Sequence, residues 1–514
     1  MNKFKLFPLA LAAFAFSACT SEDAVENNPN VEGVKSYVAV NINNVGAGGT
    51  RADVYEDGSA KENAIQNVRF YFFTKDGKPY KVSGGTTNYK DVDVTGNNPS
   101  GTENVERITD AVLVIDGVNK SYPYSMMAVV NPKTIEEGVL KEFMSEEDVQ
   151  AAIATQNFKG QKADATNFVM TSSVYANDKG EKVWTSNISG HVAMSEAEAL
   201  NSPVDIYVER VAAKITSTAK GETNHTFQVG ETSTGTPVYA RIEGWGIDNE
   251  KSDAYLVKSI DGASSWTDLG FVWNNPAFNR CYWEKTNTPS PAEHKSWAEY
   301  TIQLGENWYT VPNAGVNTTR PLYVVAATLV DANNHPIELC TYKTVEYLSE
   351  DDVKATIASE NKKYMKDMGN GVYKSIEKED LQFVAADNKY DVKAQLKDGV
   401  NVFVKTGEEY VAANQLANDA LGASNARIYK SGMTYYSTAI KHLGEAGKDG
   451  EIGMVRNHFY KVNITNITGF GTPVYDKDTD FVPVVPEDDP FTYLAARINV
   501  LSWRVVANDV NLGK

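Results

Sequence analysis

The sequence predicts a mainly β protein made of two tandem β-sandwich domains with a few short helices. Short runs rich in β-branched and aromatic residues, such as Asn67–Thr74, recur along the chain, and turn signals such as Asp76-Gly77 separate them. The chain has 514 residues, which is enough for two or three domains with a sizeable core. Tyrosine is abundant, with 27 residues, as is common in exposed β proteins.

An internal similarity supports the plan of two domains. Residues 144–154 and 348–358 share a pattern in which a Ser is followed by an Asp three residues later, with apolar residues four apart. This pattern predicts a short helix with a Ser N-cap in each segment. Each segment follows a strongly apolar run, Tyr124–Val130 or Leu322–Val330. Two domains of similar plan explain the similarity, and convergence on a common capping motif explains it equally well.

The N-terminus is typical of an exported protein. Residues 1–18 carry Lys3 and Lys5 before an apolar run that is too short to span a bilayer, so they are predicted to be a signal peptide. The run Phe16-Ser17-Ala18-Cys19 is similar to a bacterial lipobox, in which Cys19 becomes the lipidated N-terminus. The alternative is an ordinary signal peptide with an incidental cysteine.

Residues 19–51 are predicted to be a propeptide that contains a removable first strand. Within this segment, apolar and polar residues alternate with a period of two over residues 34–45, which indicates a half-buried strand. The apolar face consists of Val34, Val38, Val40 and Ile42. A glycine-rich run ends at Arg51, and a basic residue among small residues is a suitable site for a trypsin-like protease. The mature chain would then begin at Ala52.

We expect the first β-sandwich domain to span residues 52–215 and the second to span residues 216–490. Near the boundary, Val204–Ile215 changes the face on which its apolar residues lie. Such a change of phase predicts either a β-bulge or a crossing between two sheets.

Residues 491–514 form the last strand and a tail that continues to be apolar. The run Tyr493–Val506 contains no Pro or Gly and is dense in β-branched and aromatic residues, so we expect it to be extended. An ordered apolar terminus needs a groove, which either its own sandwich or another subunit could provide. The candidate residues for a donor strand are Val505, Val506, Val510 and Leu512.

Charge and cysteine content narrow the function further. The formal net charge is −18, which makes nucleic acid and anionic lipid poor partners. Membrane attachment is therefore expected only through the lipid of the precursor. Besides Cys19, the chain has Cys281 and Cys340, which could form one disulfide or remain two buried thiols.

The motifs of common enzymes and metal sites are absent from the sequence. There is no GxSxG, Walker or HExxH motif, so we predict a protein without catalytic residues, metal or cofactor. The carboxylates at Asp476, Asp478 and Asp480 have the spacing of a calcium loop, but Phe481 stands where such a loop needs Gly. A solvated acidic loop is the better interpretation.

Several segments, in their order along the chain, resemble the Bacteroides-type fimbrillins, or type V pilins. These are the lipobox, the strand followed by Arg51, Val208–Ile215, Phe278–Glu284, Thr318–Leu329, Asn457–Val474 and Ile498–Val506. The chain is most similar to the minor, or short-fimbria, shaft subunits of that family.

The resemblance implies two transthyretin-like β-sandwich domains, export as an outer-membrane lipoprotein, and removal of the first strand by an Arg-specific surface protease at Arg51. Subunits would then join head to tail by donor-strand exchange, with the C-terminal tail as donor. The implied partners are other copies of the chain, accessory tip and anchor subunits, and host or bacterial surface receptors. The implied role is a structural shaft subunit of a surface fimbria that mediates adhesion and biofilm formation.

Two alternatives belong to other classes of function. A surface glycan-binding lipoprotein would use exposed tryptophans such as Trp266 or Trp297 as sugar platforms, although packing at the core or rim is their expected role. Such a protein has no need for a cleavable strand. A fimbrial tip subunit should lack the donor tail, and an anchor subunit should lack the Arg site, whereas this chain has both.

Overall fold

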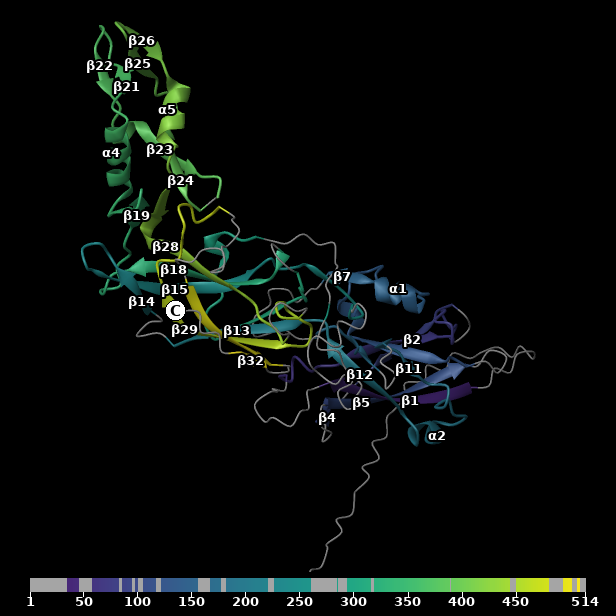
Figure 1. Ribbon diagram of the computed structural model, residues 1–514. Coiled ribbons are helices and arrows are strands. Elements are labelled where there is room, and N and C mark those ends of the chain that lie inside the picture. Colours follow the sequence, from purple (N-terminus) through teal and green to yellow (C-terminus); the bar gives the residue numbers. More distant parts are fainter. Residues whose placement is uncertain are drawn as a thin grey trace, which may run out of the picture.

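The protein is mainly β, as predicted, and its strands form several sheets (Figure 1). The computed structural model describes residues 35–45, 58–82, 86–94, 98–99, 105–116, 122–155, 167–176, 182–220, 226–259, 284, 294–315, 319–388, 390–443, 450–479, 493–501 and 506–508. Within these ranges, no helix has the length and apolar character needed to cross a membrane. The division into two tandem transthyretin-like domains stays a prediction.

The N-terminal sheet has the strand order β3-β2-β6-β8-β12-β1-β5-β4, with β11 paired to β6. Its strands are β1 (Lys35–Val45), β2 (Asn67–Phe73), β3 (Tyr89–Asp93), β4 (Asn98–Pro99), β5 (Val105–Asp116), β6 (Ser125–Val130), β8 (Met170–Ser172), β11 (Ser186–Asn187) and β12 (Val204–Arg210). Strand β6 is buried on both faces, which explains its unbroken apolar sequence. One face of the sheet encloses a core that includes Phe70, Met126 and Ile206.

The sandwich follows the N-terminal sheet and consists of two facing sheets, β17-β13-β29-β31-β32 and β14-β15-β18-β28-β30. Their bounds are β13 (Ala213–Ala219), β14 (Thr226–Glu231), β15 (Pro237–Asp248), β17 (Asn307–Thr310), β18 (Leu322–Val330), β28 (Met433–Ala439), β29 (Phe459–Thr468), β30 (Thr472–Pro473), β31 (Tyr493–Leu501) and β32 (Val506–Asn508). The core between them contains Ile215 and Val462 from one sheet and Trp245 and Tyr323 from the other.

The chain crosses from the N-terminal sheet to the sandwich between Arg210 and Ala213. The change of phase in this run therefore marks a crossing between sheets, which was one of the two predicted explanations. The expected domain boundary between residues 215 and 216 falls inside β13.

Residues 331–432 form an inserted module that the sequence patterns did not reveal. Strands β18 and β28, which flank it in sequence, are neighbours in the sandwich. The module contains β19 (Leu339–Tyr342), β20 (Val345–Tyr347), α4 (Glu350–Glu360), β21 (Tyr364–Asp367), β22 (Tyr373–Ser375), β23 (Leu381–Ala385), β24 (Val392–Leu396), β25 (Val402–Thr406), β26 (Glu409–Ala412), α5 (Asn414–Leu421) and β27 (Ala426–Tyr429). It has its own core and extends from the sandwich on the side away from β1 (Figure 1).

The two predicted capped helices are confirmed. Ser145 caps α1 (Glu146–Ala151) with a full capping box, and the side chain of Ser349 accepts a hydrogen bond from the Asp352 amide at the start of α4. Helix α1 is followed by β7 (Ile153–Thr155), which pairs with β16 (Asp253–Tyr255), whereas α4 packs inside the inserted module. The similar sequences thus form the same local structure in different surroundings. The remaining short strands and α-helix of the described residues are β9 (Tyr175–Ala176), β10 (Lys182–Val183) and α2 (Glu196–Leu200), and the 3-10 helices are η2 (Pro132–Thr134), η5 (Trp297–Glu299), η7 (Lys378–Asp380) and η8 (Lys430–Gly432).

Candidate functional site

Strand β1 lies inside the N-terminal sheet and has a neighbour on each side (Figure 1). It runs parallel to β12, with Val40 opposite Val204, and antiparallel to β5, with Val40 opposite Ala111. A strand in this position completes two hydrogen-bond ladders at once. Its removal would leave two strand edges unpaired, which are sites that bind another strand.

The backbone register of β1 relates its positions to buried residues of β5 and β12. Val38 is the register partner of Leu113, and Ile42 is the register partner of Ile206. Residues directly opposite one another in adjacent strands share a face. Leu113 and Ile206 are buried in the core, so positions 38, 40 and 42 occupy the face that encloses it. We call the space between β12 and β5 that β1 fills the β1 slot.

The predicted processing residues Cys19, Arg51 and Ala52 lie outside the described residues, as does Val34. The first described residue after them is Gly58, and a tight turn follows it, closed by a hydrogen bond from the Asn63 amide to the Ser59 carbonyl. In this turn the Ser59 amide donates to Glu62 Oε2 over 2.6 Å, and the Glu62 amide donates to Ser59 Oγ over 3.3 Å. These are the two hydrogen bonds of a capping box.

The turn is fastened to both the N-terminal sheet and the sandwich. Glu62 Oε1 accepts from Lys214 Nζ and from the Tyr309 hydroxyl, each at 2.9 Å. Arg210 Nε donates to the Glu62 carbonyl over 3.0 Å, and its Nη2 donates to Asn63 Oδ1. Glu62 is only 2% exposed and Arg210 is fully buried. The turn and these side chains are called the clasp below.

Electrostatics at the clasp favour the carboxylate form of Glu62. Burial alone would raise its pKa. The positive charges of Lys214 and Arg210 and the hydrogen bonds from Lys214 and the Ser59 amide have the opposite effect, and the net result is a lowered pKa. The pKa of Tyr309 is raised by burial and by the adjacent Glu62. The spacing of Ser59 and Glu62 is that of a capping box, but the sequence near them does not indicate their distant partners.

The C-terminal tail forms the edge of the sandwich. Strand β31 pairs with β29, and β32 pairs with β31, where Val506 lies opposite Val500. Within the described part of the chain, β32 has no neighbour on its other side. Of the predicted donor residues, only Val506 is described, and Val505, Val510 and Leu512 lie outside.

The structure describes Cys340 as a free, buried thiol, whereas Cys281 lies outside the described residues. Cys340 forms no disulfide with another described residue, and its pairing with Cys281 stays a prediction. Burial, followed by the nearby carboxylates Glu338 and Glu350, raises the pKa of the Cys340 thiol to about 12. The thiol is therefore protonated and unreactive at neutral pH.

The acidic loop near residue 476 is held by its own hydrogen bonds. Asp476 accepts from the Asp478 amide over 3.1 Å and from the Thr479 hydroxyl over 2.9 Å. The backbone hydrogen bond from Asp478 lowers the pKa of Asp476. Among the described residues, no group of carboxylates, histidines and cysteines is arranged to hold a metal ion.

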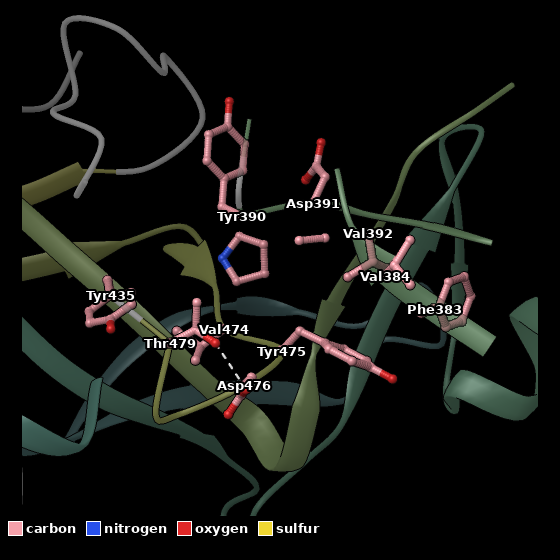
Figure 2. Close-up of a pocket in the computed structure, with 12 residues that line it drawn as sticks. Phe383, Val384, Tyr390, Asp391, Val392, Tyr435, Val474, Tyr475, Asp476 and Thr479 are labelled. Atoms are coloured by element: carbon pink, nitrogen blue, oxygen red, sulfur yellow. Dashed lines mark hydrogen bonds between the residues drawn. The ribbon is translucent and has the colours of Figure 1, made fainter. Parts of the chain in front are cut away.

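A pocket of about 330 Å³ lies between the inserted module and the segment after β30 (Figure 2). Much of its lining is apolar, including Phe383, Val392 and Val474. Two of its polar side chains have partners: Asp391 forms an ion pair with Arg427 at 3.2 Å, and the Tyr475 hydroxyl donates to Glu350 over 3.2 Å.

Trp297 is packed at the rim of the sandwich, as expected. Its indole Nε1 donates to the Thr434 carbonyl over 3.1 Å, and its ring contacts a buried cluster that includes Tyr300 and Tyr435. Trp266 lies outside the described residues.

Comparisons with known proteins give one family match and several solved structures of low identity and low TM-score. No curated protein sequence matches the chain. A candidate cell adhesion protein from Parabacteroides distasonis ATCC 8503 has 15% identity and a TM-score of 0.37, covering 94% of this chain and 99% of its own. A candidate cell adhesion protein from Bacteroides eggerthii DSM 20697 has 11% identity and a TM-score of 0.39, covering 93% of this chain and 98% of its own. The tip fimbrial protein Mfa3 from Porphyromonas gingivalis, with a C-terminal truncation, has 11% identity and a TM-score of 0.29, covering 84% of this chain and 95% of its own.

The family model that matches the chain describes the C-terminal part of fimbrillin, the major fimbrial subunit protein type IV, and it matches residues 427–509. These residues include β28, β29 and β31 of the sandwich. The match confirms the predicted resemblance of this chain to the Bacteroides-type fimbrillins.

Proposed function

We propose that this protein is the shaft subunit of a surface fimbria and that β1 occupies the place of a neighbour's strand until assembly. The precursor is exported as a lipoprotein through Cys19, and an Arg-specific protease cuts after Arg51. Strand β1 then leaves its slot, and the C-terminal tail of another copy enters. The observation that supports this most strongly is the position of β1 between β12 and β5.

The proposed release depends on the tether between β1 and the rest of the chain. Each buried aliphatic side chain contributes roughly 1.5–3 kcal/mol, so the apolar face of β1 contributes on the order of 5–10 kcal/mol before entropy costs. While β1 is tethered, its high effective concentration excludes an incoming strand. A cut after Arg51 removes this advantage without changing any contact in the slot.

The incoming strand must replace both the apolar side chains and the two hydrogen-bond ladders of β1. This mode of recognition is β-augmentation. The tail has the required alternation, because Val506, Val510 and Leu512 are an even number of residues apart and share one face of an extended strand. Slot and donor are different surfaces of one subunit, so the contact is head to tail and extends into a filament.

The N-terminal residue of the protein taken from the cell surface tests this proposal. We expect shed filaments to begin at Ala52, and the Arg51→Lys variant serves as a control for a protease that requires Arg. A surface protein that begins at lipidated Cys19 would contradict the shaft role and would indicate an anchor subunit.

A second experiment examines the slot directly. A synthetic peptide of residues 505–514 should bind the cut precursor and displace β1, while the uncut precursor should not bind it. A peptide with Asp at positions 510 and 512 is the matched control. Equal binding of both peptides would contradict the assignment of the tail as donor.

A further inference from the structure

The clasp lies at the end of β12 where β1 also ends. Asn44, near the end of β1, is opposite Val208, and Arg210 is the last residue of β12. Arg210 in turn holds the Glu62 carbonyl and the Asn63 side chain. Residues 46–57, which contain Arg51, thus connect the end of β1 to the turn of the clasp, and both lie at the same end of β12.

We propose that the clasp holds residues 58–64, which follow the new N-terminus in sequence, on the subunit when β1 is released. The cut after Arg51 then frees the chain up to residue 51, while residues 58–64 stay on the subunit. The β1 slot is vacated, but the strands around it keep their connection to the sandwich. This inference rests on the proposed function, because it concerns the state that follows the cut.

Buried charge is the reason that the turn stays in place. Lys214 is 6% exposed and Arg210 is fully buried. The Glu62 carboxylate pairs with Lys214, and the Glu62 backbone carbonyl accepts a hydrogen bond from Arg210. If the turn left, both cations would lose these partners in a site with little access to water. Removing one member of a buried ion pair is strongly unfavourable because the other charge stays desolvated.

The clasp also links the N-terminal sheet to the sandwich. Arg210 Nη1 donates to Asn457 Oδ1 over 2.9 Å. Asn457 lies two residues before Phe459, the first residue of β29. Tyr309 belongs to β17 at the edge of the same sheet. The retained turn therefore contacts both β12 of the slot and the sandwich that carries the donor tail.

Hydrogen exchange of the purified full-length precursor, before and after cutting with an Arg-specific protease, tests the inference. The probes are the amides of Asn63 and Ala64, which donate to the carbonyls of Ser59 and Lys61. We expect these amides to stay protected in the wild type after the cut. In Glu62→Gln, exchange after the cut should be about tenfold faster or more, because a charged hydrogen-bond acceptor is lost. The amides of β2 serve as an internal reference and should not change.

Glu250→Gln is the matched control. Glu250 is also 2% exposed, and it accepts from Lys295 Nζ at 2.7 Å and from Trp308 Nε1 at 2.8 Å, but it does not belong to the clasp. This variant should leave residues 59–64 unchanged. If Glu62→Gln folds poorly, Tyr309→Phe removes one hydrogen-bond donor and keeps the ring, and it should show a smaller change in the same direction.

Two results would overturn the inference: loss of protection at residues 59–64 in the cut wild type, or equal exchange there in Glu62→Gln and Glu250→Gln. The mass of the retained chain, measured in the same samples, shows separately whether residues 35–45 have left. If β1 stayed bound after the cut while Glu62→Gln still released residues 59–64, the proposed strand release would be wrong and the clasp would be supported.

Discussion

Strands β1 and β32 lie near opposite ends of the chain and differ in the number of neighbours that hold them. Strand β1 has β12 on one side and β5 on the other, whereas β32 pairs with β31 at the edge of the sandwich. The ladder of β1 with β5 extends over the whole of Lys35–Val45, while β32 consists of Val506–Asn508.

Under the proposed function, this difference is the reason that release of β1 requires a protease whereas release of β32 does not. A strand held on both sides cannot leave unless two ladders break together, so a covalent cut is required to make its departure favourable. A short edge strand has one ladder to break and can separate from its neighbour reversibly. This contrast between an enclosed strand and an edge strand can be tested at both ends of the chain.

The largest effect is expected for Arg51→Ala. The subunit should be exported and folded but remain monomeric and lipid-anchored, because the tethered β1 keeps its slot filled. Electron microscopy of the cell surface should show no filaments of this subunit. Normal filaments made from this variant would show that assembly does not depend on the cut.

Deletion of residues 505–514 should give a subunit that accepts a donor strand but cannot supply one. Mixed with wild type, it should shorten filaments in proportion to its dose, because each truncated subunit ends a filament. Thermal unfolding of the purified precursor is the control. Since β32 is an edge strand, the truncation should change the unfolding temperature little, and a large loss would mean that the tail completes its own sandwich.

Single charged substitutions in the tail should separate donor residues from bystanders. Val510→Asp and Leu512→Asp should abolish incorporation as donor, because an unpaired carboxylate in an apolar slot is strongly unfavourable. Val505→Asp, on the opposite face of the strand, is the matched control and should assemble. The same loss in all three variants would indicate that no single face is seated in the slot.

Substitutions in β1 should affect the precursor and leave the mature subunit unchanged. Ile42→Ala should lower the free energy of unfolding of the precursor by about 2–5 kcal/mol, as is usual for the truncation of a core aliphatic residue. Ile206→Ala, at the paired position on β12, should destabilise both forms because β12 remains after the cut. Denaturant unfolding of both forms measures the effect, and a destabilised mature form of Ile42→Ala would mean that β1 is retained.

The smallest effect concerns pH. The pKa of Glu62 is lowered from its ordinary value of 4.5 in the folded state. Its carboxylate therefore stabilises the fold above pH 4.5, and this contribution is lost as the pH falls below 4.5 towards the folded-state pKa. Glu62→Gln should show a smaller decrease in unfolding free energy over that range than wild type. An unchanged pH dependence would show that Lys214 and Arg210 do not stabilise the charged form of Glu62.

Local sequence was sufficient for the features that depend on a few consecutive residues. The alternation in residues 34–45 predicted the strand β1, and Ser145 and Ser349 predicted the starts of two helices, because side-chain period and capping are properties of a single segment. The change of phase in residues 204–215 likewise marked the crossing between sheets. The resemblance in the C-terminal part was also contained in the sequence alone.

The neighbours of each segment were decided only by tertiary structure. Nothing near Val40 in the sequence indicates that Val204 and Ala111 flank it, and nothing near Glu62 points to Lys214 or Tyr309. The inserted module was missed for the same reason, since β18 and β28 pair across residues 331–432. Strand pairing and buried ion pairs join residues that are far apart in the chain, and their partners are selected by packing of the whole core rather than by local conformational preference.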